Sequence, residues 1–438
     1  MRAGESDWAE VFSTAPRFFA KIPVMKWLIL FLFLLILAAR LWLRRLNLQH
    51  LARHGHEVPA GFSGEVDAAL LARTSDYTLA NSRIGLIETL VGSLLLVLFL
   101  FAGPLAWYDR WISGLTDSFI SQGVLFVIGL IMAQALLDIP FSLYRTFVLE
   151  ERFQFNTSTP RIWFTDLLKS LGIGVFLMSL LAAGALALVQ ASPGGWWLWV
   201  WGFFAAITLL LMYLSPVLIE PLFFKFQPLQ NAQLDERVKA VMARAGLQVD
   251  RVQQVDASRR SKHSNAYFTG IGRVKRIVLF DTLLEQMTDD EIIGVLAHEA
   301  GHWRLGHIWK RLVTMELVSL VVCWLAWRLL AWGGLPGLLG LEDLSFAGQV
   351  LLLGCLASLI SFPLTPLSSA LSRRHEWQAD HFALVLTGQA EPLARALVKL
   401  CRENLSNLHP HPLYAWFYYS HPPVVARIGR LAGGQELS

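Results

Sequence analysis

The stretch TDDEIIGVLAHEAGH, residues 288–302, predicts a helix that presents two histidines on one face. It opens with a threonine and, three residues later, a glutamate, which is the spacing of a capping box at a helix N-terminus. His298 and His302 are four residues apart, so both imidazoles can reach a single metal ion. Glu299 lies one step round the helix, where a carboxylate can deprotonate water at the open position of that ion.

A catalytic metal site of this kind needs a third protein ligand. His307 is the nearest candidate, but on a continuous helix it lies on the side opposite His298, so we expect it to be a polar residue at the helix exit. Glu376 and Asp380, in the stretch EWQAD, are also four residues apart and share one face of a second helix. One of these carboxylates can bind the ion while the other orients a ligand histidine.

The composition indicates a membrane protein. Of the 438 residues, 55% are hydrophobic and only 16% are charged, whereas soluble domains have about 25% charged residues. Disorder, collagen and small disulfide scaffolds are excluded, and the 17 Trp and 27 Phe suit aromatic belts at membrane interfaces. The net charge of +4 is spread over short loops, so nucleic-acid binding is not expected. The 3 cysteines imply no disulfide framework.

Seven segments are apolar and long enough to cross a bilayer, which takes about 20 residues. They are residues 22–43, 89–108, 119–137, 171–189, 196–219, 312–332 and 346–371. Lys and Arg are concentrated in alternate loops and in the C-terminal tail, and such residues accumulate on the cytoplasmic side. The alternation predicts a cytoplasmic C-terminus and an external N-terminus. The exception is the N-terminal segment itself, which holds Arg2, Arg17, Lys21 and Lys26.

Two stretches between the spans are polar. Residues 44–84 predict a polar loop that contains a helix. Residues 225–311 predict the largest soluble piece, with a helix at 234–245 and short strands at 251–255 and 274–280. Because the third-ligand stretch follows the last span, two spans separate it from the HExxH helix, and both stretches are expected on the same side of the membrane.

In combination, these motifs resemble those of the type I CAAX prenyl protease family, membrane zinc metallopeptidases of the gluzincin type. Besides HEAGH at 298–302 and EWQAD at 376–380, similar stretches are FVLEERFQFN at 147–156, EPLFFKF at 220–226, HSNAYF at 263–268 and SHPP at 420–423. HExxH alone is shared by many families, whereas the combination is specific.

The resemblance implies a mainly α fold, in which a seven-transmembrane-helix bundle encloses a chamber. A zinc-metallopeptidase (gluzincin-like) α+β domain lies on the cytoplasmic side. The expected parts are 1–224 with five transmembrane helices, 225–311 with HExxH, 312–371 with helices six and seven, and 372–438 with the third zinc ligand.

The resemblance also implies the roles of the site residues. His298, His302 and Glu376 are implied as ligands of one Zn²⁺ per chain, Glu299 as the general base, and Asp380 as an auxiliary acid near the ligands.

Other residues match positions at which the family contacts its substrate. Asn265, Ala266 and Tyr267 match the substrate strand, whose exposed edge pairs with an extended peptide; otherwise this stretch is an ordinary loop between two strands. His421 and Arg427 match positions near the oxyanion or the C-terminal carboxylate of the substrate, and the bland alternative for both is a structural role.

The expected function is hydrolysis of peptide bonds by a zinc-activated water in a multi-pass membrane protein. CAAX prenyl proteases remove the C-terminal tripeptide of prenylated proteins, so the expected partners are a peptide or prenylated protein substrate and the lipid bilayer. The short loops and the ending GQELS at 434–438, without a retrieval signal, favour a compact bacterial member in the inner membrane. For such a member, a prenylated substrate is less certain than for the family as a whole.

Two further functions are compatible with parts of the sequence. A membrane-protein quality-control metallopeptidase would use the same zinc chemistry, and the ligands do not distinguish it. A transporter or scaffold would explain charged residues within spans, such as Glu88, Glu316 and Arg328. A site-2-type protease is disfavoured, because it would place HExxH inside a span, whereas charged residues surround the motif here.

Overall fold

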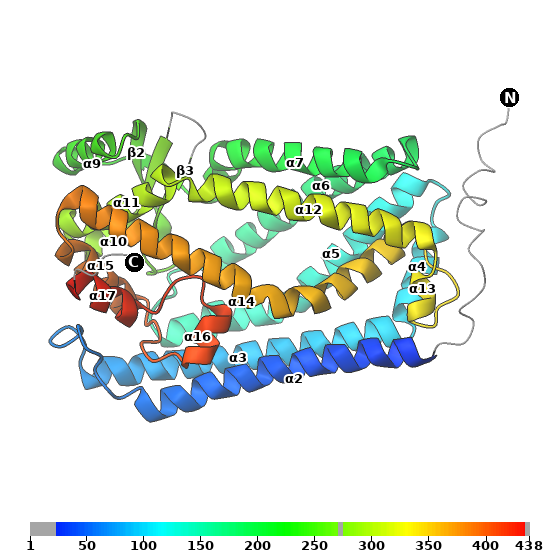
Figure 1. Cartoon of the computed structure of the whole chain (residues 1–438), viewed down its shortest axis with the longest axis horizontal. Coiled ribbons are helices and arrows are strands. Elements are labelled where there is room, and N and C mark those ends of the chain that lie inside the picture. Colours follow the sequence, from blue (N-terminus) through cyan, green and yellow to red (C-terminus); the bar gives the residue numbers. More distant parts are fainter. Residues whose placement is uncertain (1–22, 270–274, 434–438) are drawn as a thin grey trace.

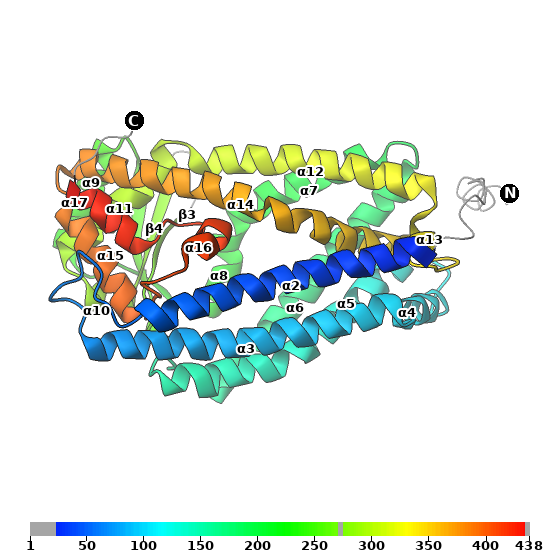
Figure 2. The same ribbon diagram turned by 60° about the horizontal axis from the view of Figure 1, so that its bottom comes forward.

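The computed structural model describes residues 23–269 and 275–433. Seven of the helices in these ranges are long and apolar enough to cross a membrane, as the sequence predicts. They run roughly along the long axis of the molecule (Figures 1 and 2). Their bounds are α2 (Pro23–His54), α3 (Ala68–Phe101), α5 (Phe119–Tyr144) with the π-helical η1 (Arg145–Glu150), α6 (Pro160–Ala191), α7 (Trp196–Leu214) with η2 (Ser215–Ile219) and α8 (Glu220–Phe223), α12 (His307–Trp332) and α14 (Phe346–Thr387).

The polar stretch 44–84, predicted as a loop that contains a helix, does contain helix: α2 and α3 continue into it with polar residues and leave only 55–67 as a connection. One predicted boundary is wrong. The span predicted at 89–108 ends too late. Gly103 has a φ of 104°, in the left-handed region, and separates α3 from a second helix, α4 (Pro104–Ser113). Residue 22 of the first predicted span, with Arg2, Arg17 and Lys21, lies outside the described residues.

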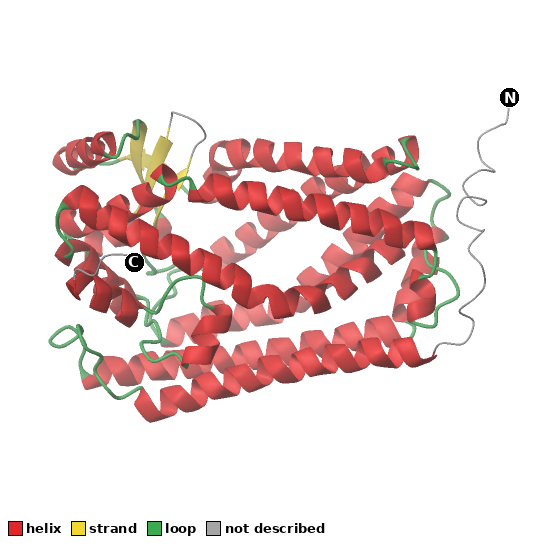
Figure 3. Ribbon diagram, viewed as in Figure 1, coloured by secondary structure: helices red, strands yellow, loops and turns green. Residues whose placement is uncertain are grey.

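One end of the bundle carries a four-stranded sheet in the order β1-β2-β4-β3 (Figure 3). β2 and β4 are parallel, and the two outer pairs are antiparallel. Within the described residues β3 is therefore an edge strand, next to β4. The strands are β1 (Phe226–Pro228), β2 (Val249–Val255), β3 (Ala266–Thr269) and β4 (Lys275–Phe280).

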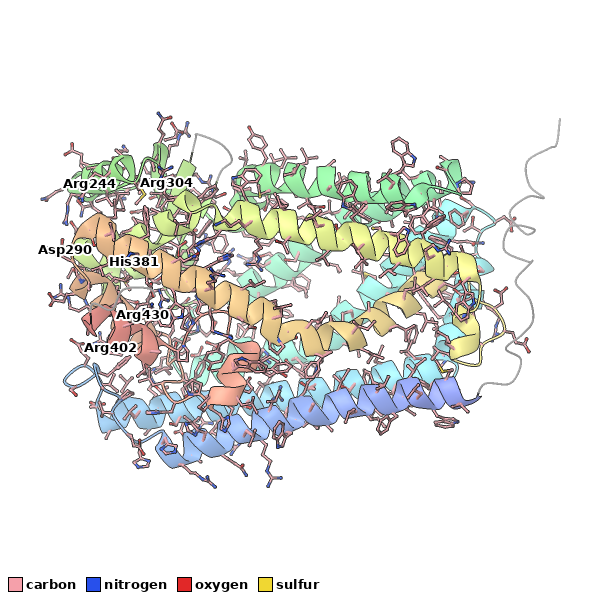
Figure 4. The ribbon with its side chains drawn as sticks, viewed as in Figure 1. Arg244, Asp290, Arg304, His381, Arg402 and Arg430 are labelled. Carbon is pink, nitrogen blue, oxygen red and sulfur yellow. The ribbon has the colours of Figure 1, made fainter. Side chains whose placement is uncertain are left out.

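The helices at this end are α9 (Ala232–Arg244), η3 (Ala257–Arg259), α10 (Asp281–Gln286), α11 (Asp289–Arg304), α15 (Glu391–Glu403), α16 (Pro412–Tyr418) and α17 (Val424–Gly433). α13 (Leu335–Leu338) lies at the other end. The predicted helix 234–245 and the strands 251–255 and 274–280 are confirmed within about two residues, although residue 274 lies outside the described ranges. Figure 4 shows charged side chains at the sheet-bearing end: Arg244, Asp290, Arg304, His381, Arg402 and Arg430.

The core of the sheet-bearing end is shared between distant parts of the chain. Phe62 from the α2–α3 connection is fully buried there, together with Met242 of α9, Ile277 of β4, Leu296 of α11 and Ile428 of α17. Burying an aromatic side chain contributes about 2 kcal/mol or more. The connection between the first two membrane helices is thus part of the same core as the HExxH helix.

α11 and α14 approach each other closely at Gly301. A Cβ on Gly301 would lie 3.0 Å from the Cα of Ala379 and 3.2 Å from its carbonyl oxygen. α14 also bends (Figure 1), and it contains Pro363 and Pro366, each of which removes a helical hydrogen bond. The absent side chain at 301 lets the backbones of the two helices touch.

We expect Gly301→Ala to destabilise the fold by about 1–3 kcal/mol, because the added methyl group meets backbone atoms that cannot move independently. The separated helices should also hold the metal ion less tightly. Thermal unfolding and metal content after dialysis measure both effects. Gly354→Ala on α14 is the matched control, since a Cβ there meets no heavy atom within 4 Å. Equal behaviour of the two variants would contradict this view of the α11–α14 contact.

Candidate metal centre

Two packed helices bring three metal-ligating side chains together. His298 and His302 of α11 and Glu376 of α14 each offer one ligand atom, and these atoms lie within 4.8 Å of one another. The two Nε2 atoms are 3.3 Å apart, and they lie 3.4 Å and 3.3 Å from the nearest Glu376 oxygens. Ligand atoms about 2.1 Å from a tetrahedral ion are separated by about 3.4 Å. The two imidazoles are therefore at about the tetrahedral separation from each other, and each is at that separation from a different Glu376 oxygen, Oε2 for His298 and Oε1 for His302.

A buried oxygen of Glu376 also points to an ion. Glu376 is 4% exposed, and no donor among the described residues is aligned to hydrogen-bond its Oε2. Nδ1 of His421 is 2.8 Å away, but this contact lacks hydrogen-bond geometry. A buried carboxylate oxygen without a donor is costly, and a cation bonded to this atom would remove the cost.

Burial lowers the pKa of His298, but the neighbouring carboxylates of Asp380 and Glu376 outweigh it and raise the value to about 9. A metal ion must therefore displace a proton from the metal-free site, so its affinity falls as the pH falls.

Asp380 orients His298 from behind. His298 Nδ1 donates to Asp380 Oδ1 at 2.8 Å, which leaves Nε2 free for the ion. Arg427 of α17, itself buried, donates to both oxygens of Asp380, at 2.8 and 2.5 Å. This pairing fixes the carboxylate in the plane that the imidazole needs.

His307 orients the other ligand, contrary to its predicted place opposite His298. α11 ends at Arg304, and Gly306 has a φ of 70° in the left-handed region, so the chain turns before α12 begins at His307. Nδ1 of His307 lies 3.1 Å from Nδ1 of His302, and its Nε2 lies 2.9 Å from Oε1 of Gln378. Since the amide oxygen accepts from Nε2, Nδ1 of His307 is left to accept from His302. His375 stacks on His307 with ring centroids 4.1 Å apart.

The N-terminus of the HExxH helix is fixed as the sequence predicts. The capping box between Thr288 and Glu291 is present. Glu291 is buried and also accepts from Lys399 of α15 at 2.7 Å. Gly294 allows the backbone of α15 to approach, since a Cβ there would lie 2.9 Å from the nitrogen of Leu393.

The remaining predicted residues lie at different depths. Glu299 is half-buried on α11, between the two ligand histidines in sequence. His421 is 64% exposed next to Glu376, whereas Arg427 is buried and paired with Asp380. The contacts of Arg427 favour a positioning role over direct binding of substrate, and its substrate role stays a prediction.

The edge strand β3 packs against α11. The N–H of Phe280 donates to the carbonyl of Asn265 at 3.1 Å, so this pair is a hydrogen-bonded one. Hydrogen-bonded pairs alternate along an antiparallel ladder. The backbone groups of Ala266 and Phe268 therefore face away from β4, toward the open edge. The Ala266 N–H donates at 2.8 Å to the side chain of Asn265, and the hydroxyl of Tyr267 donates to Glu220 at 2.9 Å.

Sequence reasoning missed His307, Gln378 and Lys399 as partners of the site. The glycine at 306 was the available signal for His307, since glycine commonly ends a helix in the left-handed conformation. Gln378 lies within the quoted EWQAD stretch, between two residues that were identified. Nothing local distinguishes Lys399.

Comparison with known proteins covers both halves of the chain. The family described as CAAX prenyl protease N-terminal, five membrane helices, matches residues 47–225, and peptidase family M48 matches residues 228–434. The CAAX prenyl protease 1 homolog of Arabidopsis thaliana is 33% identical over 397 residues, which cover 86% of this chain and 90% of that protein. The CAAX prenyl protease 1 of Saccharomyces cerevisiae is 36% identical over 332 residues, covering 72% and 73% of the two proteins. The crystal structure of S. mikatae Ste24p matches with a TM-score of 0.86 and 28% identity, covering 94% of this chain and 99% of that one.

We expect Glu376→Ala to abolish metal binding, because two ligands remain. His307→Leu should keep a stoichiometric ion at micromolar metal but bind it about 10–100-fold more weakly, since it loses an orienting partner and no ligand. Competition with a chromogenic chelator measures both affinities. Trp309→Leu, on an exposed side chain of α12, is the control for the loss of an aromatic side chain there. The reverse order of the two effects would make His307 the third ligand.

Proposed function

The chain belongs to peptidase family M48, and from this membership we propose that His298, His302 and Glu376 bind one zinc ion and that Glu299 is the general base. The membership confirms the resemblance, the mainly α fold and the metallopeptidase activity that the sequence predicts. The protein is an integral-membrane metallopeptidase, and the transporter or scaffold reading is not supported.

One observation supports the ligand set above all others. Three ligand atoms from two helices lie within 4.8 Å of one another, and the two histidines each have an orienting partner behind them. Zinc bound there supplies Lewis-acid chemistry, activating water and polarising a carbonyl. Two imidazoles and one carboxylate form a donor set typical of catalytic zinc, which leaves one position open.

The reaction follows from the position of Glu299 beside the ligands. Its carboxylate accepts a proton from the attacking water as the water oxygen forms a bond to the carbonyl carbon. The same carboxyl group then gives that proton to the amide nitrogen as the carbon–nitrogen bond breaks. The second water proton passes from the new carboxyl group to the amine, so the products are a carboxylate and an ammonium group, and Glu299 returns to its starting state. His421, exposed beside Glu376, is the candidate donor to the developing oxyanion.

The open edge of β3 is suited to hold the substrate chain. Ala266 and Phe268 direct their N–H and carbonyl groups outward, so an extended peptide can pair with them by β-augmentation. In this structure the Ala266 N–H donates a hydrogen bond to the side chain of Asn265. When a peptide binds, a carbonyl of the peptide backbone would replace that side chain as the acceptor. Because such pairing uses backbone atoms, it tolerates many side chains.

The substrate class follows from the names of the relatives. We propose that the chain removes the C-terminal tripeptide of a prenylated CAAX sequence, within a chamber that the helices enclose. The site faces the cytoplasm in this proposal, in agreement with the distribution of Lys and Arg along the loops. The placement in a bacterial inner membrane and the boundaries at residues 224, 311 and 371 stay proposals as well.

The purified protein should release the tripeptide from a farnesylated CAAX peptide, observed by mass spectrometry. Glu299→Gln should lower kcat about 100- to 10,000-fold, because it removes the general base, while the zinc content stays at one per chain. Faster cleavage of an unmodified membrane-protein peptide than of the farnesylated one would favour the quality-control function. Substantial activity of Glu299→Gln would refute its role.

Ala266→Pro should raise KM for the same peptide roughly tenfold, because one edge N–H is lost. The sheet itself should survive, since that N–H does not bond to β4. Ala266→Ser, which keeps the N–H, is the matched control. Unchanged KM in Ala266→Pro would place the substrate strand elsewhere.

A further inference from the structure

A second polar cluster lies where the segment before β3 meets the membrane helices. His263 Nε2 is 3.2 Å from Glu150 Oε2 of η1, and its Nδ1 is 2.8 Å from Asn404 Oδ1, just after α15. The hydroxyl of Tyr77 on α3 donates to the other oxygen of Glu150 at 2.8 Å. The ring of Phe155 stacks on the imidazole with centroids 4.2 Å apart. These five residues are called the His263 clamp.

Both ring nitrogens of His263 face oxygen atoms that accept hydrogen bonds. The orientation of the Asn404 amide follows from the Ser264 N–H, which donates to the same Oδ1 at 3.4 Å. A neutral imidazole has only one N–H group. His263 must therefore carry both protons to make both hydrogen bonds, so it is an imidazolium. The face of the Phe155 ring also favours a cation.

Backbone irregularities converge on the clamp. Gln154, with a φ of 63°, and Leu405, with a φ of 48°, are the only non-glycine residues with positive φ in ranges 23–269 and 275–433. They directly adjoin Phe155 and Asn404. Such conformations are strained and cluster at functional sites. The π-helical turn η1, which presents Glu150, is a third irregularity of this kind.

The clamp is joined to the peptide-binding edge by a short piece of backbone. The N–H of Lys262 donates to the carbonyl of Phe155 at 3.0 Å, and the hydroxyl of Thr282 donates to the carbonyl of His263 at 3.1 Å. β3 begins only three residues after His263. The position of His263 therefore decides where the edge of β3 starts.

We propose that His263, held as an imidazolium between Glu150 and Asn404, is a positioning residue that fixes the start of the peptide-binding edge against the membrane helices. The proposal rests on β3 being the substrate strand, as the proposed function has it. His263 does not touch the reacting atoms. It acts on KM, through the edge that receives the peptide.

The clamp should weaken at alkaline pH. Burial lowers the pKa of His263, but the hydrogen bonds to Glu150 and Asn404 outweigh it and raise the pKa above the ordinary value. The charged groups around it are Glu150 and Arg145 on η1, and the neutral, titratable Tyr77 on α3 faces Glu150. Because the folded value is raised, the stabilisation is complete below the ordinary histidine pKa and is lost as the pH rises through the raised one.

The test compares His263→Gln and Glu150→Gln with Lys262→Gln, which removes a positive charge from an exposed neighbouring side chain. At pH 6 the first two should raise KM for the farnesylated peptide roughly tenfold, with kcat and zinc content unchanged. Amides of residues 261–269 should exchange hydrogen roughly tenfold faster. The double variant should have about the same KM as either single variant, because both substitutions break the same contact between His263 and Glu150.

Wild-type protein should approach the exchange rate of His263→Gln as the pH rises, after correction for intrinsic rates, while His263→Gln itself shows no such transition. This readout needs no substrate and tests the clamp even if His263→Gln folds poorly. The proposal would be overturned if His263→Gln had the KM and the hydrogen-exchange rates of the wild type. It would also be overturned if His263→Gln lost kcat and zinc content to the same extent. Faster exchange with unchanged KM would leave the clamp in place but overturn its action on the substrate, and with it the assignment of β3. If the wild type does not cleave the farnesylated peptide, only the proposed substrate is refuted, and the hydrogen-exchange comparison still tests the clamp.

Discussion

The contact between α11 and α14 is the constraint on which the metal centre depends. Ligand atoms must lie about 3.4 Å apart around a tetrahedral ion, so the helices that present them must touch at the backbone. Gly301, one residue before the second ligand histidine, provides that contact against Ala379. Gly294 and the Glu291–Lys399 ion pair then hold the same helix against α15. One helix is thus fixed on two sides before any metal binds.

The two ligand histidines are oriented by partners of different charge. Asp380 receives the proton of His298 and is itself neutralised by Arg427, whereas His302 is held by the neutral His307 and Gln378. With both imidazoles neutral, Glu376 and Asp380 carry two negative charges and Arg427 one positive charge, so these groups have one net negative charge; the proposed base Glu299 becomes neutral as it takes the proton of the water. A bound divalent cation reverses the sign, and the positive site then favours an oxyanion over the neutral carbonyl from which it forms. Without Arg427, the negative charge of Asp380 would not be neutralised, and the site with its divalent cation would no longer have a net positive charge.

The sequence was sufficient where the structure is local. The capping box, the i and i+4 ligands and the apolar lengths of the spans depend on residues near one another in the chain, and they were predicted. The parity of the spans placed Glu376 and Asp380 on the same side as the HExxH helix, whereas the choice of Glu376 as the ligand came from the family resemblance and stays a prediction. The position of His307 was not predicted, because a helical projection assumes a continuous helix and Gly306 breaks it. The clamp was beyond reach for another reason: Tyr77, His263 and Asn404 are far apart in sequence, and no periodicity relates them.

The membrane helices do more than place the active site in a bilayer. Two contacts connect β3 to these helices. His263, just before the strand, contacts Glu150, and Tyr267, within the strand, donates a hydrogen bond to Glu220, the first residue of α8. Glu220 also accepts from Arg276 of the neighbouring strand β4 at 3.1 Å. Both anchors of the edge strand therefore lie at or near the ends of candidate transmembrane segments: Glu150 is the last residue of one, and Glu220 lies in the last turn of another. Since Phe62 of the α2–α3 connection lies in the same core as α11, a soluble fragment would lose the anchors of the edge as well as part of its core. The proposed peptide-binding edge and the membrane helices thus belong to one folded unit.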